Sequence, residues 1–324
     1  MAAQAGQGGL SMALPTHLLD RLKVPAIAAP MFLVSGTDMV LAACRAGIIG
    51  AFPANNARTL DDLDAWMSLI GRELPAEAPP WAINIMVHRS YARKDEELEL
   101  VLKHRPPIVI TALGAPSGVV DAIHGYGGLV FADVNSLTHA EKAAAAGVDG
   151  LILVASGAGG HTGPISGFAF APAVREMFDG TLVLGGGIGS GRAILAAQAL
   201  GADLAYLGTR LIACAESMAQ PAYKQMLIEA RAEDIVTSAA LTGIPANWLR
   251  QSLLAAGYDP ASLTGRAEIQ LGRPEDSAKR WRDVWAAGHG VGEVKTIEPL
   301  AAIVESLAAD YERARATVGA GRRA

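Results

Sequence analysis

The sequence has little of what marks several common classes of protein. Only two of its 324 residues are cysteine, and 18% are charged. Cys44 and Cys214 lie far apart in apolar surroundings, which indicates buried free thiols and argues against a disulfide or a metal pair. The net charge is −5 and no basic patch stands out, so nucleic acid is not expected as a partner.

Long apolar runs are also absent. No window holds about 18 uninterrupted apolar residues, so we expect no membrane span. Residues 1–14 are rich in Gly, Ala and Gln and lack a basic stretch followed by an apolar core. They predict a disordered lead-in and argue against a signal peptide. With the scarcity of cysteine, this favours a cytoplasmic location.

Three catalytic signatures are missing. Among the seven histidines, no pair at i, i+4 spacing has an acidic partner, so no metal site is expected. The G-x-S-x-G elbow of serine hydrolases is absent around Ser156, because residue 154 is valine. No dinucleotide fingerprint follows the first apolar run, which argues against a Rossmann fold.

The chain does contain eight short apolar runs separated by helical patterns. Runs of this length that are apolar throughout are typical of strands buried on both faces of a parallel sheet. They cover residues 26–31, 48–52, 81–87, 108–113, 129–134, 151–155, 182–184 and 204–207. The expected helices are 38–46, 59–74, 93–103, 117–124, 136–146, 170–178 and 191–200. Eight alternations predict a (β/α)₈ TIM barrel, with a doubly wound sheet as the competitor.

The alternation stops after about residue 210. Residues 212–258 look helical with a break at 243–245, and 265–282 are polar. We therefore expect a barrel made of residues 15–214 and 286–318, closed by a last helix over 299–315. Residues 215–285, called the inserted segment below, would form a small helical subdomain on the substrate side. Its apolar character would suit a homodimer.

Two glycine-rich strand ends predict a phosphate site. Residues 181–190 read TLVLGGGIGS, and a helix is expected to follow from Gly191, so bare backbone N–H groups would meet a phosphate at a helix N-terminus. Gly208 and Thr209 stand at the next strand end and add further donors. Loops after the seventh and eighth strands are where barrels commonly bind phosphate. The alternative is that the glycines only permit tight turns.

One stretch presents a titratable side chain at a strand end. Residues 147–163 read GVDGLILVASGAGGHTG, in which five small residues precede His161. Histidine titrates near neutrality and is a common general base. The alternative is a loop histidine that caps a turn.

Several of these segments together resemble the nitronate monooxygenase family, formerly called 2-nitropropane dioxygenases. The matching segments are Ala29-Pro30-Met31, Asn84 within AINI, residues 147–163, GGGIGSGR from residue 185, LGTR from residue 207, and Ala287-Gly288-His289-Gly290. The resemblance extends from about residue 22 to residue 292. FMN-dependent enoyl-acyl-carrier-protein reductases share the barrel and a similar A-G-G-H loop.

The resemblance implies an FMN-containing TIM barrel that oxidises alkyl nitronates or nitroalkanes to carbonyl compounds and nitrite with O₂. His161 would be the catalytic histidine, acting as base or as holder of the nitronate anion. Near the flavin ring, the implied contacts are the backbone of Pro30 and Met31, together with Asn84, Asp133 and Gly160. The implied phosphate contacts are Gly186, Gly187, Gly208 and Thr209. The segment Ala287, Gly288 and His289 would close over the flavin. His88 and Ser156 are candidates for the substrate pocket.

Two positions depart from the family pattern. Members usually carry Gln where His289 stands, and either side chain can form a hydrogen bond. Some members have Lys where this chain has Asp133, so the charge near the flavin would be reversed and the substrate or the flavin potential could differ. Two other functions stay open: an NAD(P)H-dependent reductase of a quinone or enoyl thioester on the same fold, and a flavin- or phosphate-binding barrel without turnover.

Overall fold

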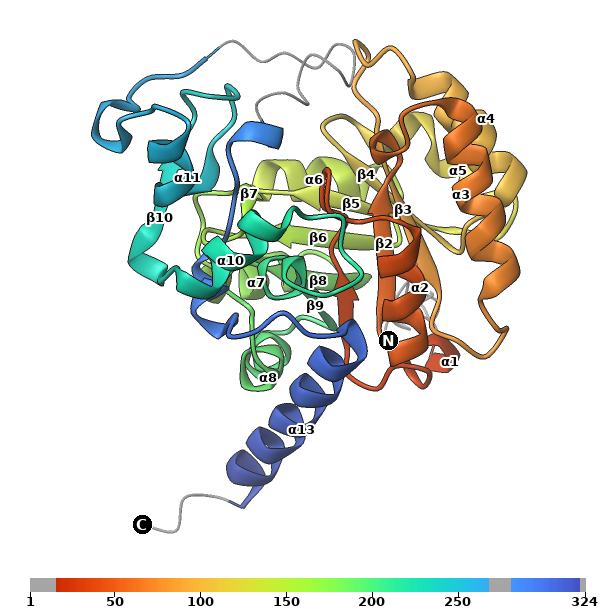
Figure 1. The fold of residues 1–324 in the computed structure, drawn as a ribbon. Helices are drawn as coiled ribbons and strands as arrows, with labels where there is room; N and C mark the ends of the chain where they lie inside the picture. The colour runs from red at the N-terminus through yellow and green to blue at the C-terminus, as the bar shows by residue number, and fades with distance from the viewer. Residues whose placement is uncertain (1–15, 268–280, 321–324) are drawn as a thin grey trace, which may run out of the picture.

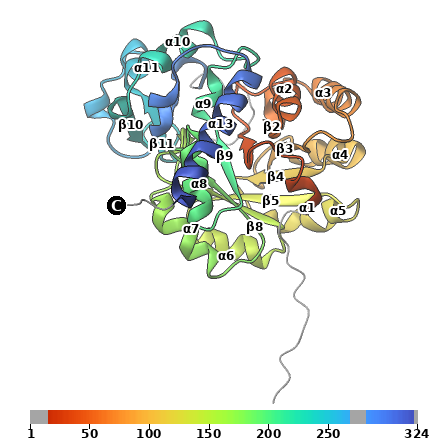
Figure 2. The same ribbon diagram turned by 90° about the horizontal axis from the view of Figure 1, so that it is seen from below.

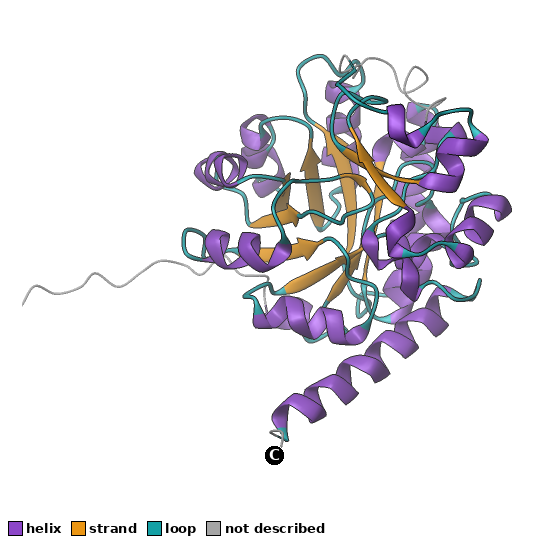
Figure 3. Ribbon diagram, turned by 90° about the vertical axis from the view of Figure 1, so that its left-hand side faces the viewer, coloured by secondary structure: helices purple, strands orange, loops and turns teal. Residues whose placement is uncertain are grey.

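Eight parallel strands close into a barrel, as the alternation predicts (Figures 1 and 3). The computed structural model describes residues 16–267 and 281–320. β9 pairs with β1 through Leu207 and Ala28, which completes the ring. The barrel strands, in their order around the ring, are β1 (Ala26–Ala28), β2 (Ile49–Pro53), β3 (Trp81–Met86), β4 (Ile108–Ala112), β5 (Leu129–Val134), β6 (Gly150–Val154), β8 (Thr181–Gly185) and β9 (Leu204–Leu207).

Helices cover the outside of the barrel (Figure 3). They are α2 (Thr37–Ala46), α3 (Leu60–Glu73), α4 (Lys94–His104), α5 (Val120–His124), α6 (Leu137–Ala145), α7 (Gly167–Arg175), α8 (Gly191–Ala199) and α13 (Leu300–Gly319), with the short α1 (Thr16–Leu19) before the first strand. Thr59 forms a capping box with Asp62 at the start of α3, and Ser136 and Ser190 cap α6 and α8. The last helix, α13, packs against α8 and α2 and completes the outer layer (Figure 2).

The side chains inside the barrel lie in layers. A buried cluster that includes Ile27, Phe131 and Leu204 fills the interior. Because strand side chains alternate, the residue two positions later on each strand points the same way. The next layer therefore lies at the carboxyl ends of the strands, where TIM barrels place their active sites.

The inserted segment differs from the expected all-helical subdomain. It contains α10 (Pro221–Glu229) and α11 (Arg250–Ala255), but also the strands β10 (Ile235–Ser238) and β11 (Ala246–Leu249). These strands pair antiparallel, and β11 also pairs with β7 (Gly160–His161), which gives a three-stranded sheet in the order β10-β11-β7. The helical prediction for 212–258 is wrong at these strands, because pairing with the barrel loop and packing around Trp248 decide their conformation.

Some predictions fall partly outside the described residues, namely the lead-in over 1–14 and most of the polar stretch 265–282. Within the described chain, no helix has both the length and the apolarity needed to cross a membrane. Cys44 and Cys214 are buried and free, as predicted. Burial raises the pKa of the Cys44 thiol to about 12 and that of Cys214 to about 11.

Candidate active site

A cavity of about 1170 Å³ opens at the carboxyl ends of the barrel strands. Its floor is the upper layer of the barrel interior, to which each barrel strand, or in the case of β1 the residue directly after it, contributes one residue. These residues are Ala29, Pro53, Asn84, Ala112, Asp133, Val154, Gly185 and Tyr206. Five of the eight are small or apolar, so a flat apolar group can lie on this floor.

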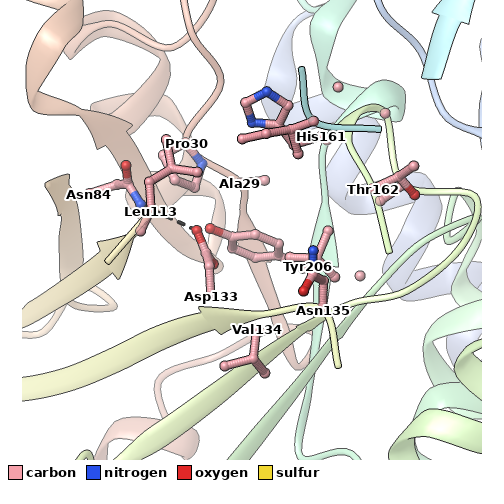
Figure 4. A pocket seen from close by; sticks show the side chains of 18 of the residues that line it. Ala29, Pro30, Asn84, Leu113, Asp133, Val134, Asn135, His161, Thr162 and Tyr206 are labelled. Atoms are coloured by element: carbon pink, nitrogen blue, oxygen red, sulfur yellow. Dashed lines mark hydrogen bonds between the residues drawn. The ribbon is translucent and has the colours of Figure 1, made fainter. Parts of the chain in front are cut away.

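Three polar side chains form the rest of the floor (Figure 4). The Asn84 amide donates a hydrogen bond to Asp133 Oδ2 at 3.4 Å. Asp133 Oδ1 and the Tyr206 hydroxyl are buried and have no hydrogen-bond partner among the described residues. In Figure 4 the Tyr206 hydroxyl points toward the Asp133 carboxyl group. Buried polar atoms without partners are rare in folded proteins, which marks this floor as a place where a polar ligand can bind.

The floor also shifts the proton affinities of its two acidic groups. Burial raises the pKa of Asp133 from 3.8 to about 7, so much of this carboxyl is protonated at neutral pH. Burial and the nearby Asp133 charge together raise the pKa of the Tyr206 phenol well above its usual 10. The cavity floor therefore carries less negative charge at neutral pH than a fully ionised Asp133 would give it.

A row of free backbone N–H groups lies on the β8 and β9 side of the cavity. Among the described residues, the N–H groups of Gly187, Ile188 and Gly189 donate no hydrogen bond, and neither do those of Gly208 and Thr209. Gly187 has a φ of +71°, and a Cβ there would meet no atom within 4 Å, so its backbone faces open space. The donors at 187–189 precede α8, and those at 208–209 follow β9; together they form a cradle for an anion such as a phosphate.

The loop after β1 forms another wall, and the side chains of Asn56 and Ser35 both bond to its backbone. Asn56 Oδ1 accepts a hydrogen bond from the N–H of Leu33 at 2.7 Å, and Asn56 Nδ2 donates to the carbonyl of Met31 at 3.0 Å. Leu33 has a φ of +60°, which is uncommon for a residue other than glycine. Asn56 thus stabilises a strained turn that places Pro30 and Met31 on the cavity wall.

His161 lies on the wall above the floor (Figure 4). It belongs to β7, and its backbone pairs with Ala246 of the inserted segment. The imidazole ring meets Trp281 edge to face, with centroids 5.4 Å apart and planes at 84°. Burial lowers the pKa of His161 from 6.5 to about 4, so the imidazole is neutral at physiological pH.

The small residues before His161 allow close contact with a distant part of the chain. A Cβ at Gly159 would lie 2.7 Å from the N–H nitrogen of Gly288, and the Gly157 carbonyl accepts from the N–H of His289 at 2.9 Å. The Asn247 amide donates to the carbonyl of Ala158 at 2.7 Å. Residues 157–160 therefore pack between β11 and residues 287–290, and at Gly159 a side chain would clash with the backbone of Gly288.

The structure brings most of the predicted site residues together around this cavity. Those that line it are Pro30, Met31, Asn84, His88, Asp133, Gly160, His161, Gly186, Gly187, Gly208, Thr209 and Gly288. Ala287 is fully buried behind the lining, and His289 is exposed outside it. Ser156 is exposed and does not line the cavity, while its N–H donates to the carbonyl of Ile165 at 2.7 Å. His88 reaches the cavity but also forms a hydrogen bond with Ser90 at 2.7 Å.

Sequence reasoning missed two side chains of the site. One is Tyr206, whose side chain points into the barrel like those of Asn84 and Asp133. Because strand side chains alternate, counting two residues on from the interior Leu204 predicts this direction. The other side chain is Trp281, which contacts the His161 ring. No local pattern could assign it to His161, because the two residues are brought together by the sheet of β7, β11 and β10.

Comparison with known proteins gives consistent matches. Residues 77–310 match the family described as nitronate monooxygenase. A nitronate monooxygenase of Paraburkholderia phytofirmans is 29% identical over 305 residues, covering 81% of each chain. A hydroxy-methyl-oxo-octahydro-indene-carboxyl-CoA dehydrogenase of Mycobacterium tuberculosis is 28% identical over 248 residues, covering 75% of this chain and 68% of that protein. The solved structure of a nitroalkane oxidase from Streptomyces ansochromogenes is similar with a TM-score of 0.77 and 26% identity, covering 93% and 99% of the two chains.

Proposed function

The chain belongs to the nitronate monooxygenase family, and from this premise we propose that it is an FMN-dependent oxidase of alkyl nitronates and nitroalkanes. Its products would be a carbonyl compound and nitrite, with O₂ as the oxidant. The observation that carries the proposal is His161, a neutral imidazole on the cavity wall above a mostly apolar floor that holds three polar side chains.

The residues of the cavity fit FMN. The free N–H groups at 187–189 and 208–209 would hold its phosphate, and Thr209 Oγ1 already accepts from Gly288 N–H at 2.8 Å. Pro30 and Met31 would lie along the ring, with Gly160 on the opposite wall. The unpartnered atoms of Asp133 and Tyr206 lie where polar edges of the ring system could satisfy them. When bound, the flavin supplies the redox chemistry.

We propose that His161 is the base that removes a proton from the carbon next to the nitro group. Its low pKa leaves a free lone pair on the ring at pH 7. A neutral imidazole can donate one N–H hydrogen bond to a preformed anion, but holding the anion as an imidazolium would cost about 4 kcal/mol at pH 7 for a pKa near 4. Proton transfer instead creates the imidazolium and the nitronate together, and their attraction is strong in a cavity that excludes water.

The inserted segment is proposed as the substrate side of the site. Its residues Thr242, Ile244 and Pro245 line the cavity near His161, and Arg266 lies there as well. Thr162 N–H donates to the Pro245 carbonyl at 3.0 Å, which fixes this wall to the loop that carries His161. A mostly apolar wall of this kind suits the alkyl part of a nitroalkane.

The test replaces His161 by asparagine. The variant should keep FMN but lose about 10²–10⁴-fold in turnover of neutral nitroalkanes, the usual loss for a general base. Preformed nitronates bypass that proton transfer, so their turnover should fall much less. Unchanged turnover of the neutral substrate would show that His161 is not the base.

His124→Asn is the matched control. This histidine lies at the end of α5 and pairs with Asp149 at 2.8 Å, outside the cavity. The control should keep both activities. A flavin absorbance band near ~450 nm in the purified protein is a separate requirement of the proposal, since the oxidation belongs to the cofactor. Its absence from protein supplied with FMN would refute the proposal.

A second candidate function is an NAD(P)H-dependent reductase of an enoyl thioester or quinone. It is favoured by the extent of the cavity, which continues from the floor along α6 past His139 to Ala146 and exceeds what a small nitroalkane needs. The relative from Mycobacterium tuberculosis is itself named for a CoA thioester. Anaerobic mixing separates the two functions: rapid bleaching of the flavin by NADH or NADPH indicates the reductase, and bleaching only by nitronates indicates the oxidase.

A further inference from the structure

Aromatic rings connect His161 to the core of the inserted segment. The His161 ring contacts Trp281 edge to face, and Trp281 in turn packs on Trp248 with centroids 4.6 Å apart and planes at 34°. Trp248 is fully buried and belongs to β11. The position of Trp281 is therefore stabilised by packing on a fully buried side chain.

The imidazole of His161 lacks the polar support that other histidines of this chain have. His104 meets Asp64 and His139 meets Asn135 Oδ1 at 2.9 Å, while His124 meets Asp149. Across the described ranges 16–267 and 281–320, no hydrogen bond reaches the ring nitrogens of His161. Its backbone is held by pairing with β11, but the orientation of its ring depends on packing alone.

The contact also determines how His161 meets water and charge. Trp281 covers one side of the ring, and its six-membered ring would touch a Cβ placed at Gly160 at 3.8 Å. The charged and titratable side chains that line the same cavity are Asp133, Tyr206, Tyr223, His88, His139, Lys142 and Arg266. None of them makes a hydrogen bond or an ion pair with His161 in the described chain, and burial is the cause of its lowered pKa.

We infer that Trp281 is a positioning residue, which fixes the imidazole plane of His161 and keeps water from one side of it. It is one of the residues that the inserted segment contributes to the cavity, and it is the one whose ring contacts His161 edge to face. The inference deepens the proposed function, because the effect on turnover rests on the base role of His161. The ring contact and its effect on protonation hold whether or not His161 is the base.

The first experiment measures protonation without turnover. Protein labelled with ¹⁵N-histidine is titrated by NMR, and the His161 signal is identified by its loss in His161→Asn. In wild-type protein this ring should titrate near pH 4. In Trp281→Ala the midpoint should rise by about one pH unit or more toward 6.5, because water reaches the ring. Trp281→Phe, which keeps an aromatic ring, should shift it less.

Trp285 provides the matched control. It lies close to Trp281 in sequence but stacks on Tyr223, with centroids 5.1 Å apart, and does not line the cavity. Trp285→Phe should leave the His161 midpoint unchanged. Circular dichroism verifies folding of each variant, and Trp281→Leu replaces the alanine variant if that one unfolds. A midpoint equal to wild type in folded Trp281→Ala or Trp281→Leu overturns the inference.

The second experiment separates this inference from the proposed function. The acidic limb of kcat/KM for a neutral nitroalkane should move with the NMR midpoint in Trp281→Ala. If the NMR titration midpoint of His161 moves but the acidic limb of the kcat/KM pH profile does not, the positioning role of Trp281 stands and His161 is not the base. If the acidic limb of the kcat/KM pH profile moves but the NMR midpoint of His161 does not, the positioning role of Trp281 is refuted.

Discussion

Replacing Asp133 by asparagine should remove a pH dependence of stability from the protein. The carboxyl group lies on the cavity floor with Oδ1 buried and unpartnered in the described chain, and its pKa is raised from 3.8 to about 7. Between these values the folded protein keeps the proton while the unfolded chain releases it. Because unfolding then releases a proton, the free energy of unfolding falls as the pH rises from about 4 to about 7.

The size of the effect follows from the two pKa values. Between about pH 5 and about pH 7.5, Asp133 should lower the free energy of unfolding by about 2.5 kcal/mol. His161 acts in the opposite direction, since its pKa falls to about 4 and its contribution to stability is lost as the pH drops below 6.5. Buried Glu97, with a pKa raised to about 7, acts in the same direction as Asp133. Both other contributions are equal in wild type and Asp133→Asn, so they cancel in the comparison.

The assay is urea unfolding of both flavin-free proteins at about pH 5 and about pH 7.5. The stability of Asp133→Asn relative to wild type should rise by about 2.5 kcal/mol at the higher pH. Asp121→Asn, which neutralises an exposed carboxyl on α5, should produce no such change. If the two pH values give the same difference for Asp133→Asn, the carboxyl is ionised in the folded protein and the account of the floor is wrong.

Further substitutions test the packing of a helix, a hydrogen bond to the loop before His161 and the cap of α3. Gly191→Ala would place a Cβ 2.2 Å from backbone atoms of α13 and should lower the free energy of unfolding by about 1–3 kcal/mol. Gly71→Ala is the control on α3: its Cβ would meet no atom within 4 Å, so it should raise the free energy of unfolding by about 0.5–1 kcal/mol. Asn247→Ala removes the 2.7 Å hydrogen bond to the Ala158 carbonyl and should cost about 1–3 kcal/mol in urea unfolding; an unchanged midpoint would show that the loop is held without it. Thr59→Ala removes the capping box of α3 and should cost about 0.5–2 kcal/mol by thermal unfolding, a loss that the serine variant should largely avoid.

The barrel could be predicted from the sequence because each of its elements carries a local signal. The eight apolar runs coincide with the barrel strands to within a few residues, and the caps at Ser136 and Ser190 mark where helices begin. The row of free backbone N–H groups also has a local signal, since its glycines follow directly on strands. A buried strand, a helix cap and a glycine-rich turn can each be recognised from neighbouring residues in the sequence alone.

The inserted segment could not be predicted in the same way, because long-range contacts determine its structure. β10 and β11 are four residues each, and their sheet is completed by two residues of the loop after β6. Such short strands have no periodicity to distinguish them from helix. The protonation states of Asp133 and His161 also escaped prediction, because burial in the assembled cavity sets them.

The pairing of β7 with β11 has a consequence for how the protein is made. The barrel strands end at Leu207, but the strand that holds His161 in place begins only at Ala246. As the chain leaves the ribosome, all eight barrel strands are available before the partner of β7 exists. We therefore expect His161 to reach its final position late in folding, after all eight barrel strands are available.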